Sequence, residues 1–156
     1  LELAVELQMP VFLHQRDAHN DFFRLLKKYR SALVAAVAHC FTGGEKELHA
    51  CLEQDLYIGI TGWLCDERRA QDLQSSVKLI PDNKLMVETD APYLFPRDYQ
   101  FADEKLLSSK QKKKLRRRNE PQYLPHIIKT LAQLTNRDIS EVISSTTNNA
   151  KYFFQI

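Results

Sequence analysis

Three short apolar segments each end in a side chain that can bind a metal ion or transfer a proton. The residues at or just beyond their carboxyl ends are His14, His39 and Asp90. Imidazole and carboxylate groups are ligands for divalent ions. Parallel strands lie about 4.8 Å apart, so neighbouring strands that end in such residues can direct them at one ion. A lone histidine of this kind is more often structural, but three such ends support one another and predict a metal centre.

Glu88 places a second carboxylate two residues before Asp90. Residues i and i+2 of a strand point to the same side, which in a (β/α) barrel is the interior. Two carboxylates there are costly unless they are paired, protonated or bound to metal. The alternative is that Asp90 only caps the turn before Pro92, but the apolar lead-in argues against a surface strand.

Alternating strands and helices are expected to position these residues. Apolar runs predict strands, and amphipathic segments between them predict helices. The alternation indicates an α/β fold with parallel strands and right-handed crossovers. The predicted strands are 11–13, 34–41, 56–61 and 84–89; the predicted helices are 1–7, 18–30, 45–54, 66–79 (with Asp66 as N-cap), 122–134 and 139–153.

The chain length limits how much of a barrel can form. The 156 residues suffice for one domain, 1–156, but fall about 100 short of a typical eight-stranded barrel. The first residues read as the end of a helix. We therefore expect an incomplete barrel with about four parallel strands, whose amino-terminal half lies elsewhere.

The net charge of +2 belongs to one segment. Ser108–Arg118 holds seven basic residues and no acid, and the rest of the chain has 15 basic against 20 acidic residues. Two interpretations of 110–116 stay open: a solvated, disordered loop, or a surface that attracts phosphate. Arg118, beside a helix start, and Arg16, two residues after His14, are the better candidates for defined phosphate contacts.

The three cysteines, Cys40, Cys51 and Cys65, lack C-x-x-C spacing. Free thiols in a reducing compartment are expected rather than disulfides or a structural zinc site. No apolar run approaches the roughly 18 residues of a membrane span, and no signal peptide is visible. These features predict a cytoplasmic protein. His19, His49 and His126 are expected to be solvated.

Six motifs in order resemble the TatD family of metal-dependent deoxyribonucleases. Any one is weak, but together they cover almost the whole chain. They are L-H-x-R (13–16), H-C-F-T-G (39–43), Y-I-G-I-T-G-W (57–63), C-D-E-R-R (65–69), E-T-D-A-P-Y-L (88–94) and R-N-E-P (118–121).

The resemblance implies a TIM (β/α) barrel of the metal-dependent hydrolase type that cleaves DNA phosphodiesters, often as a 3′-5′ exonuclease. His14, His39 and Asp90 match family metal positions. The further family ligands, a Glu and a His-x-His, would precede Leu1. The family loop before R-N-E-P is usually shorter, so 96–118 is interpreted as a basic loop insertion.

The implied mechanism uses one or two divalent ions, with Mg²⁺ favoured and Mn²⁺ or Zn²⁺ as alternatives. Asp90 would orient or deprotonate water and Glu88 would support the ligands. Arg16 and the Arg118, Asn119 and Glu120 segment would bind substrate, expected to be single-stranded DNA or 3′ ends.

Two other functional hypotheses remain open at the level of sequence. The first is a catalytically incomplete half-barrel that binds nucleic acid through its basic run, or that pairs with another chain. The second is a hydrolase for an amide or another ester on the same scaffold, since a fold does not determine chemistry. The basic, phosphate-attracting segment favours the nuclease.

Overall fold

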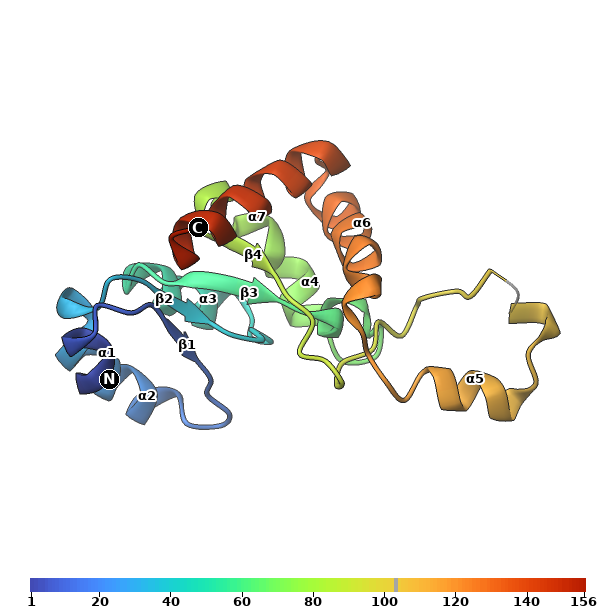
Figure 1. Cartoon of the computed structure of the whole chain (residues 1–156), viewed down its shortest axis with the longest axis horizontal. Helices are drawn as coiled ribbons and strands as arrows, with labels where there is room; N and C mark the ends of the chain where they lie inside the picture. Colours follow the sequence, from blue (N-terminus) through green and yellow to red (C-terminus); the bar gives the residue numbers. More distant parts are fainter. Residues whose placement is uncertain (103) are drawn as a thin grey trace.

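A computed structural model describes residues 1–102 and 104–156 and shows one sheet of four parallel strands (Figure 1). The strands lie in chain order: β1 (Val11–Leu13), β2 (Ala36–Ala38), β3 (Tyr57–Ile60) and β4 (Leu85–Val87). This confirms the predicted α/β fold and the predicted number of parallel strands. β1 has its predicted bounds, whereas β2, β3 and β4 are shorter than predicted at both ends.

Helices connect and follow the strands. Their bounds are α1 (Glu2–Glu6), α2 (His19–Tyr29), α3 (Glu45–Glu53), α4 (Gln71–Ser76), α5 (Ser109–Leu115), α6 (Leu124–Thr135) and α7 (Ile139–Phe154). Short 3-10 turns extend α2 and α4. No described helix has both the length and the apolar character needed to cross a bilayer.

The strands are apolar on both faces because both faces are covered. Ala36, Ile58 and Leu85 belong to the larger core, which includes buried residues of α2, α3, α4, α6 and α7. Alternate residues point to the other face, where Val37, Tyr57 and Met86 pack against Phe153 from the end of α7. Burial on both faces explains the continuous apolar runs that identified these strands in the sequence.

The sheet is open, with β1 and β4 at its edges within the described part of the chain. On the β1 edge, Phe12 stays 48% exposed although it stacks on Phe154 and meets Phe153 edge-on. A closed barrel would cover such a residue with strands from the opposite side. The expectation of an incomplete barrel therefore agrees with the observed sheet.

Asp66 was predicted to cap the helix that follows β3, and this prediction is wrong. Helix α4 begins only at Gln71, with Ala70 as its N-cap residue. The Asp66 carboxylate is 2% exposed and is bound instead by Arg68, at 3.1 Å, and Arg69, at 2.8 Å. The Arg68 N–H also donates to Oδ1 of Asp66, at 3.2 Å, so two guanidinium groups and one backbone donor hold this carboxylate before the helix begins.

A helix occupies part of the segment that was interpreted as a loop. Ser108 begins α5 with a capping box, in which its hydroxyl accepts from the Gln111 N–H and the Gln111 side chain returns to the Ser108 backbone. The residues that follow are Lys, Arg, Gln and Leu, which are good helix formers. The expected insertion 96–118 includes residue 103, which lies outside the described residues; we retain its bounds as a proposal.

Candidate metal centre

The carboxyl ends of the strands carry the predicted site residues. The parallel pairing continues one residue past the strands, since the His39 N–H donates to the Leu13 carbonyl and the Glu88 N–H donates to the Ile60 carbonyl, both at 2.9 Å. These bonds fix the backbone from which each functional side chain departs. The strand ends therefore place His14, His39 and Glu88 at the carboxyl end of the sheet.

His39 lies between two carboxylates. Its Nδ1 is 2.8 Å from Oε2 of Glu88, and its Nε2 is 3.2 Å from Oδ1 of Asp90. Burial favours the neutral ring, but the interactions with Glu88 and Asp90 outweigh it and raise the pKa of His39. The Nδ1 contact is close but poorly aligned, so this buried nitrogen has no hydrogen-bond partner within the described structure.

The two carboxylates converge for a reason that differs from the strand alternation we expected. Strand β4 ends at Val87, before either of them, and Asp90 has a left-handed backbone with φ of 55°. This turn brings Asp90 back toward His39. Non-glycine residues in this conformation carry strain and cluster at functional sites. The residue after His39, Cys40, has a φ of 50° and is strained in the same way.

Cys40 and Gly59 hold Glu88 in place, and the sequence analysis gave neither a role. The Cys40 N–H donates to Oε1 of Glu88 at 2.6 Å. A Cβ on Gly59 would overlap that oxygen and lie 2.8 Å from the Glu88 Cδ, so glycine leaves the space that the carboxylate occupies. The motifs H-C-F-T-G and Y-I-G-I-T-G-W contained both positions, but only the packing assigns them a function.

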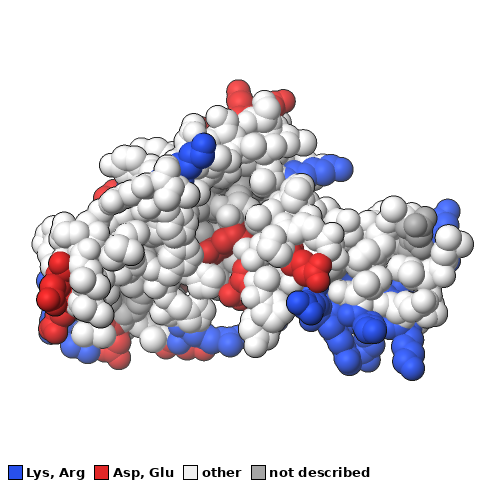
Figure 2. All heavy atoms as spheres, in the orientation of Figure 1, with Lys and Arg blue, Asp and Glu red and all other residues white. Residues whose placement is uncertain are grey.

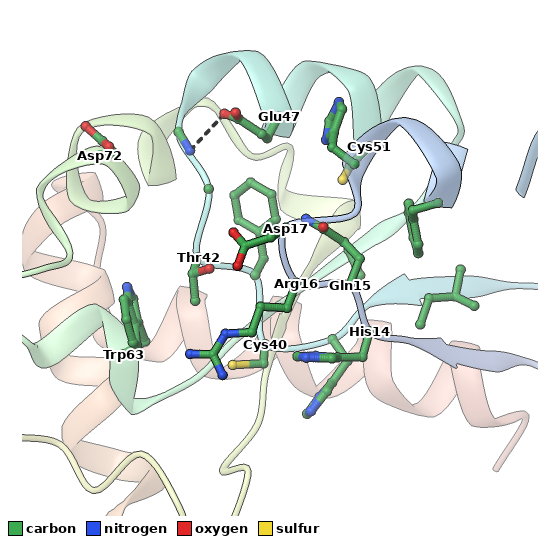
Figure 3. Close-up of a pocket in the computed structure, with 18 of the residues that line it drawn as sticks. His14, Gln15, Arg16, Asp17, Cys40, Thr42, Glu47, Cys51, Trp63 and Asp72 are labelled. Atoms are coloured by element: carbon green, nitrogen blue, oxygen red, sulfur yellow. Dashed lines mark hydrogen bonds between the residues drawn. The ribbon is translucent and has the colours of Figure 1, made fainter. Parts of the chain in front are cut away.

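An open pocket of about 870 Å³ lies at the carboxyl end of the sheet, and its lining includes His14, Arg16, His39, Trp63 and Asp90. The His14 and His39 rings are 5.9 Å apart between centroids. In Figure 3, Arg16 extends from the segment after β1 toward Cys40, and Trp63 stands on another wall. The pocket thus combines imidazole and carboxylate groups with an exposed cation.

The R-N-E-P segment is joined to the centre through the backbone. Asn119 is 1% exposed, and its amide nitrogen donates to the carbonyls of Thr89, at 2.7 Å, and Leu94, at 3.2 Å. Asn119 therefore positions the chain next to Asp90. Arg118 is 76% exposed in its side chain and lies 3.6 Å from Glu120. The described structure shows no contact between Arg118 and His39, Glu88 or Asp90.

A second group of potential ligands shares no residue with the predicted set. One ligand atom each from Cys65, Asp98 and His126 lies within 4.8 Å of the others. The His126 and Asp98 side chains are 2.7 Å apart, so His126 is partly covered rather than fully solvated as expected. Cys65 is a free thiol that contacts Thr130, and burial raises its pKa to about 12. The group is a possible cation site, and its members also satisfy one another without an ion.

The sequence of the chain matches the family described as TatD related DNase over residues 1–155. The chain belongs to the TatD family. It is 50% identical over 156 residues to a protein named 3′-5′ ssDNA/RNA exonuclease TatD from Citrobacter rodentium, which covers all of this chain and 55% of that relative. A protein of the same name from Erwinia amylovora is 48% identical over 154 residues, covering 99% of the chain and 55% of the relative.

Solved structures of the TatD family support the fold. A hydrolase TatD family protein from Entamoeba histolytica superposes with a TM-score of 0.75 at 28% identity, covering 93% of this chain and 50% of that one. The TatD homologue YjjV from Escherichia coli gives a TM-score of 0.80 at 24% identity, over 99% and 53%. The chain thus spans about half the length of the relatives it matches, and it corresponds to their carboxyl-terminal part.

Proposed function

We propose that this chain supplies the carboxyl-terminal half of a metal-dependent nuclease centre that hydrolyses DNA phosphodiester bonds, as a 3′-5′ exonuclease on single-stranded DNA or 3′ ends. The observation that carries the proposal is His39, held with a carboxylate at each ring nitrogen at the carboxyl ends of parallel strands. The printed function of the TatD relatives supports the substrate class.

The residues present fit a divalent cation. Glu88 faces Nδ1 of His39, and a carboxylate in that place favours the tautomer that carries its proton on Nδ1. The lone pair of Nε2 is then directed to the side where Asp90 lies. His14, His39 and Asp90 would hold the ion together with ligands from the rest of the whole protein. Mg²⁺ suits a hydrated, carboxylate-containing site for phosphate chemistry, and Mn²⁺ or Zn²⁺ would suit the two imidazoles.

Each remaining side chain has a defined task in this proposal. A bound cation would lower the pKa of water and polarise the phosphoryl oxygen. Asp90 accepts a proton from the attacking water, whose oxygen bonds to phosphorus as the bond to the leaving sugar oxygen breaks, and the leaving oxygen takes up a proton from solvent. Glu88 keeps His39 oriented. Arg16, on the pocket wall, and Arg118 bind the phosphate oxygens, while Asn119 and Glu120 position Arg118.

The test of this proposal also distinguishes it from the other hypotheses. A half-barrel that depends on its missing half or on another chain would bind nucleic acid without cleaving it alone, and the open sheet favours such dependence. We further propose that the protein works in the cytoplasm, because its three cysteines are free thiols and two of them are buried.

The decisive experiment compares Asp90→Asn with Asp17→Asn in the whole protein. Asp17 also lines the pocket and has a left-handed backbone that Asn tolerates, so it is a matched carboxylate control. With single-stranded DNA and Mg²⁺ or Mn²⁺, Asp90→Asn should lower the cleavage rate by about 100-fold or more, and Asp17→Asn should leave it near wild type. Equal rates for Asp90→Asn and wild type would refute the site.

A further inference from the structure

Three of the four lysines of α5 lie on one side of the helix. Lys110, Lys113 and Lys114 are three and four residues apart, which places them on the same side of an α-helix, and Arg117 follows in the turn just after the helix end. All four side chains are exposed. The helix stands away from the sheet (Figure 1), and Lys and Arg side chains gather over it (Figure 2). We call these four residues the basic face.

The carboxyl end of α5 is attached to the body of the protein through Arg116, the residue that follows the helix. The Arg116 guanidinium donates to the carbonyls of Arg97, at 2.5 Å, and Tyr99, at 2.9 Å. It also lies 5.7 Å from the centre of the Phe101 ring, within reach of a cation–π interaction. Arg116 is partly buried, so it anchors the end of the helix, whereas the four residues of the basic face are exposed.

The carboxyl end of α5 is close to the candidate metal centre along the chain. The helix ends at Leu115, and four residues later the buried Asn119 is bonded to the backbone of Thr89 and Pro92, on either side of Asp90. Seven helical residues span about 10 Å, which is enough for several phosphates of a single strand. A short segment, bonded to the backbone beside Asp90, thus joins the basic face to the centre.

Two features of charge indicate that the basic face has an anionic partner. Its members are like charges at i,i+3 and i,i+4 spacing, which destabilises an isolated helix and is relieved by a polyanion. Outside 108–118 the chain carries 15 basic against 20 acidic residues, so the excess positive charge of the chain lies in this segment. Such a concentration of positive charge attracts a phosphate backbone.

We propose that α5 is an arm that binds the phosphate backbone of single-stranded nucleic acid beyond the nucleotide being cleaved. This inference rests on the proposed nuclease function, because the arm would bind another part of the same substrate. The arm contributes affinity that is independent of base sequence and sensitive to salt, and it makes no contact with the reacting phosphate. Longer strands should therefore bind better than strands too short to reach α5.

The test replaces the basic face by glutamine (Lys110→Gln, Lys113→Gln, Lys114→Gln, Arg117→Gln) and measures binding of a fluorescent oligothymidylate in EDTA by anisotropy across a salt series. The matched control removes four exposed lysines elsewhere, Lys27, Lys28, Lys78 and Lys151, also as glutamine. Four lost phosphate contacts should reduce the slope of log Kd against log salt by about 3. Affinity at low salt should fall at least about tenfold, and the control should stay close to wild type.

Several outcomes would overturn the arm. Unchanged binding by the basic-face variant, or equal loss in both variants, would show that the helix has no special role. Arm-dependent binding to phosphatidylserine vesicles without arm-dependent binding to the oligonucleotide would assign α5 to a membrane surface instead. Because binding is measured without metal, failure of the nuclease function appears separately, as an absence of Mg²⁺- or Mn²⁺-dependent cleavage in the wild type.

Circular dichroism of both variants verifies that the fold is retained. In the cleavage assay, the basic-face variant should raise KM for a long oligonucleotide and leave kcat near wild type. A drop in kcat with unchanged KM would contradict a role restricted to binding.

Discussion

Carboxylates gather around one histidine in the candidate metal centre, whereas α5 presents cations to solvent. In the centre, each charge has a partner within about hydrogen-bond distance, and Gly59 and Cys40 fix Glu88 from two sides. On α5, the four exposed cations repel one another and depend on water for their stabilisation. Neighbouring backbone therefore holds a charged group of the candidate centre in place, while the cations of the basic face are left accessible to solvent.

The largest effect should come from removing the centre's histidine. His39→Ala deletes a proposed ligand and leaves Glu88 and Asp90 facing each other without the ring between them. Metal-dependent cleavage of single-stranded DNA should fall by about 100-fold or more, and calorimetric titration should show weaker Mn²⁺ binding. His49→Ala, at a side chain that is 58% exposed, is the control. Equal activity in both variants would place the chemistry elsewhere.

Gly59→Ala tests whether the centre depends on packing rather than on charge alone. The added methyl group collides with Glu88, so the free energy of unfolding measured in urea should fall by about 1–3 kcal/mol. The rate of metal-dependent cleavage should also fall. In a Glu88→Ala background the same methyl group has room, so its effect on stability should shrink in a double-mutant cycle. If the two changes instead lowered the free energy of unfolding additively, residues 59 and 88 would not compete for the same space.

Asp66 provides a buried carboxylate outside both regions. Hydrogen bonds from Arg68 lower its pKa most, and Arg69 adds to the effect. Its ionised form therefore stabilises the fold above the unfolded pKa of about 3.9, and this contribution is lost as the pH falls toward the lower folded value. Asp66→Asn should lower the free energy of unfolding at pH 7 and flatten its decrease below about pH 4. If the free energy of unfolding fell with pH in parallel for Asp66→Asn and wild type, this role of Asp66 would be contradicted.

The smallest effect should come from one lysine of the basic face. Lys113→Gln should lower the slope of log Kd against log salt by about 0.7 and leave the free energy of unfolding within about 0.5 kcal/mol of wild type. Lys78→Gln should change neither quantity. If Lys113→Gln lowered the free energy of unfolding as much as Gly59→Ala does, the distinction between the two regions would be contradicted.

The periodicity of the sequence predicted most elements because most are buried on a regular stripe. The strands 11–13 and 56–61 and the helices 122–134 and 139–153 were located within a few residues of their observed bounds. Within α7 the apolar Ile143 is 46% exposed, while Thr146 takes a buried place. A threonine can do so because its hydroxyl donates to the Val142 carbonyl at 2.7 Å, which a reading based on apolar residues does not anticipate.

The sequence by itself determined the parallel α/β order, the identity of the polar residues at the strand ends and the concentration of positive charge in one segment. These features follow from local patterns of apolar, charged and turn-forming residues. The tertiary structure alone decided that Glu88 and Asp90 meet His39 from opposite sides, because this depends on two left-handed backbone positions and on the space left by a glycine in a neighbouring strand. It also decided that residues 109–115 form a helix with exposed lysines, and that contacts of Arg116 with Arg97 and Tyr99 attach the end of this helix to the body.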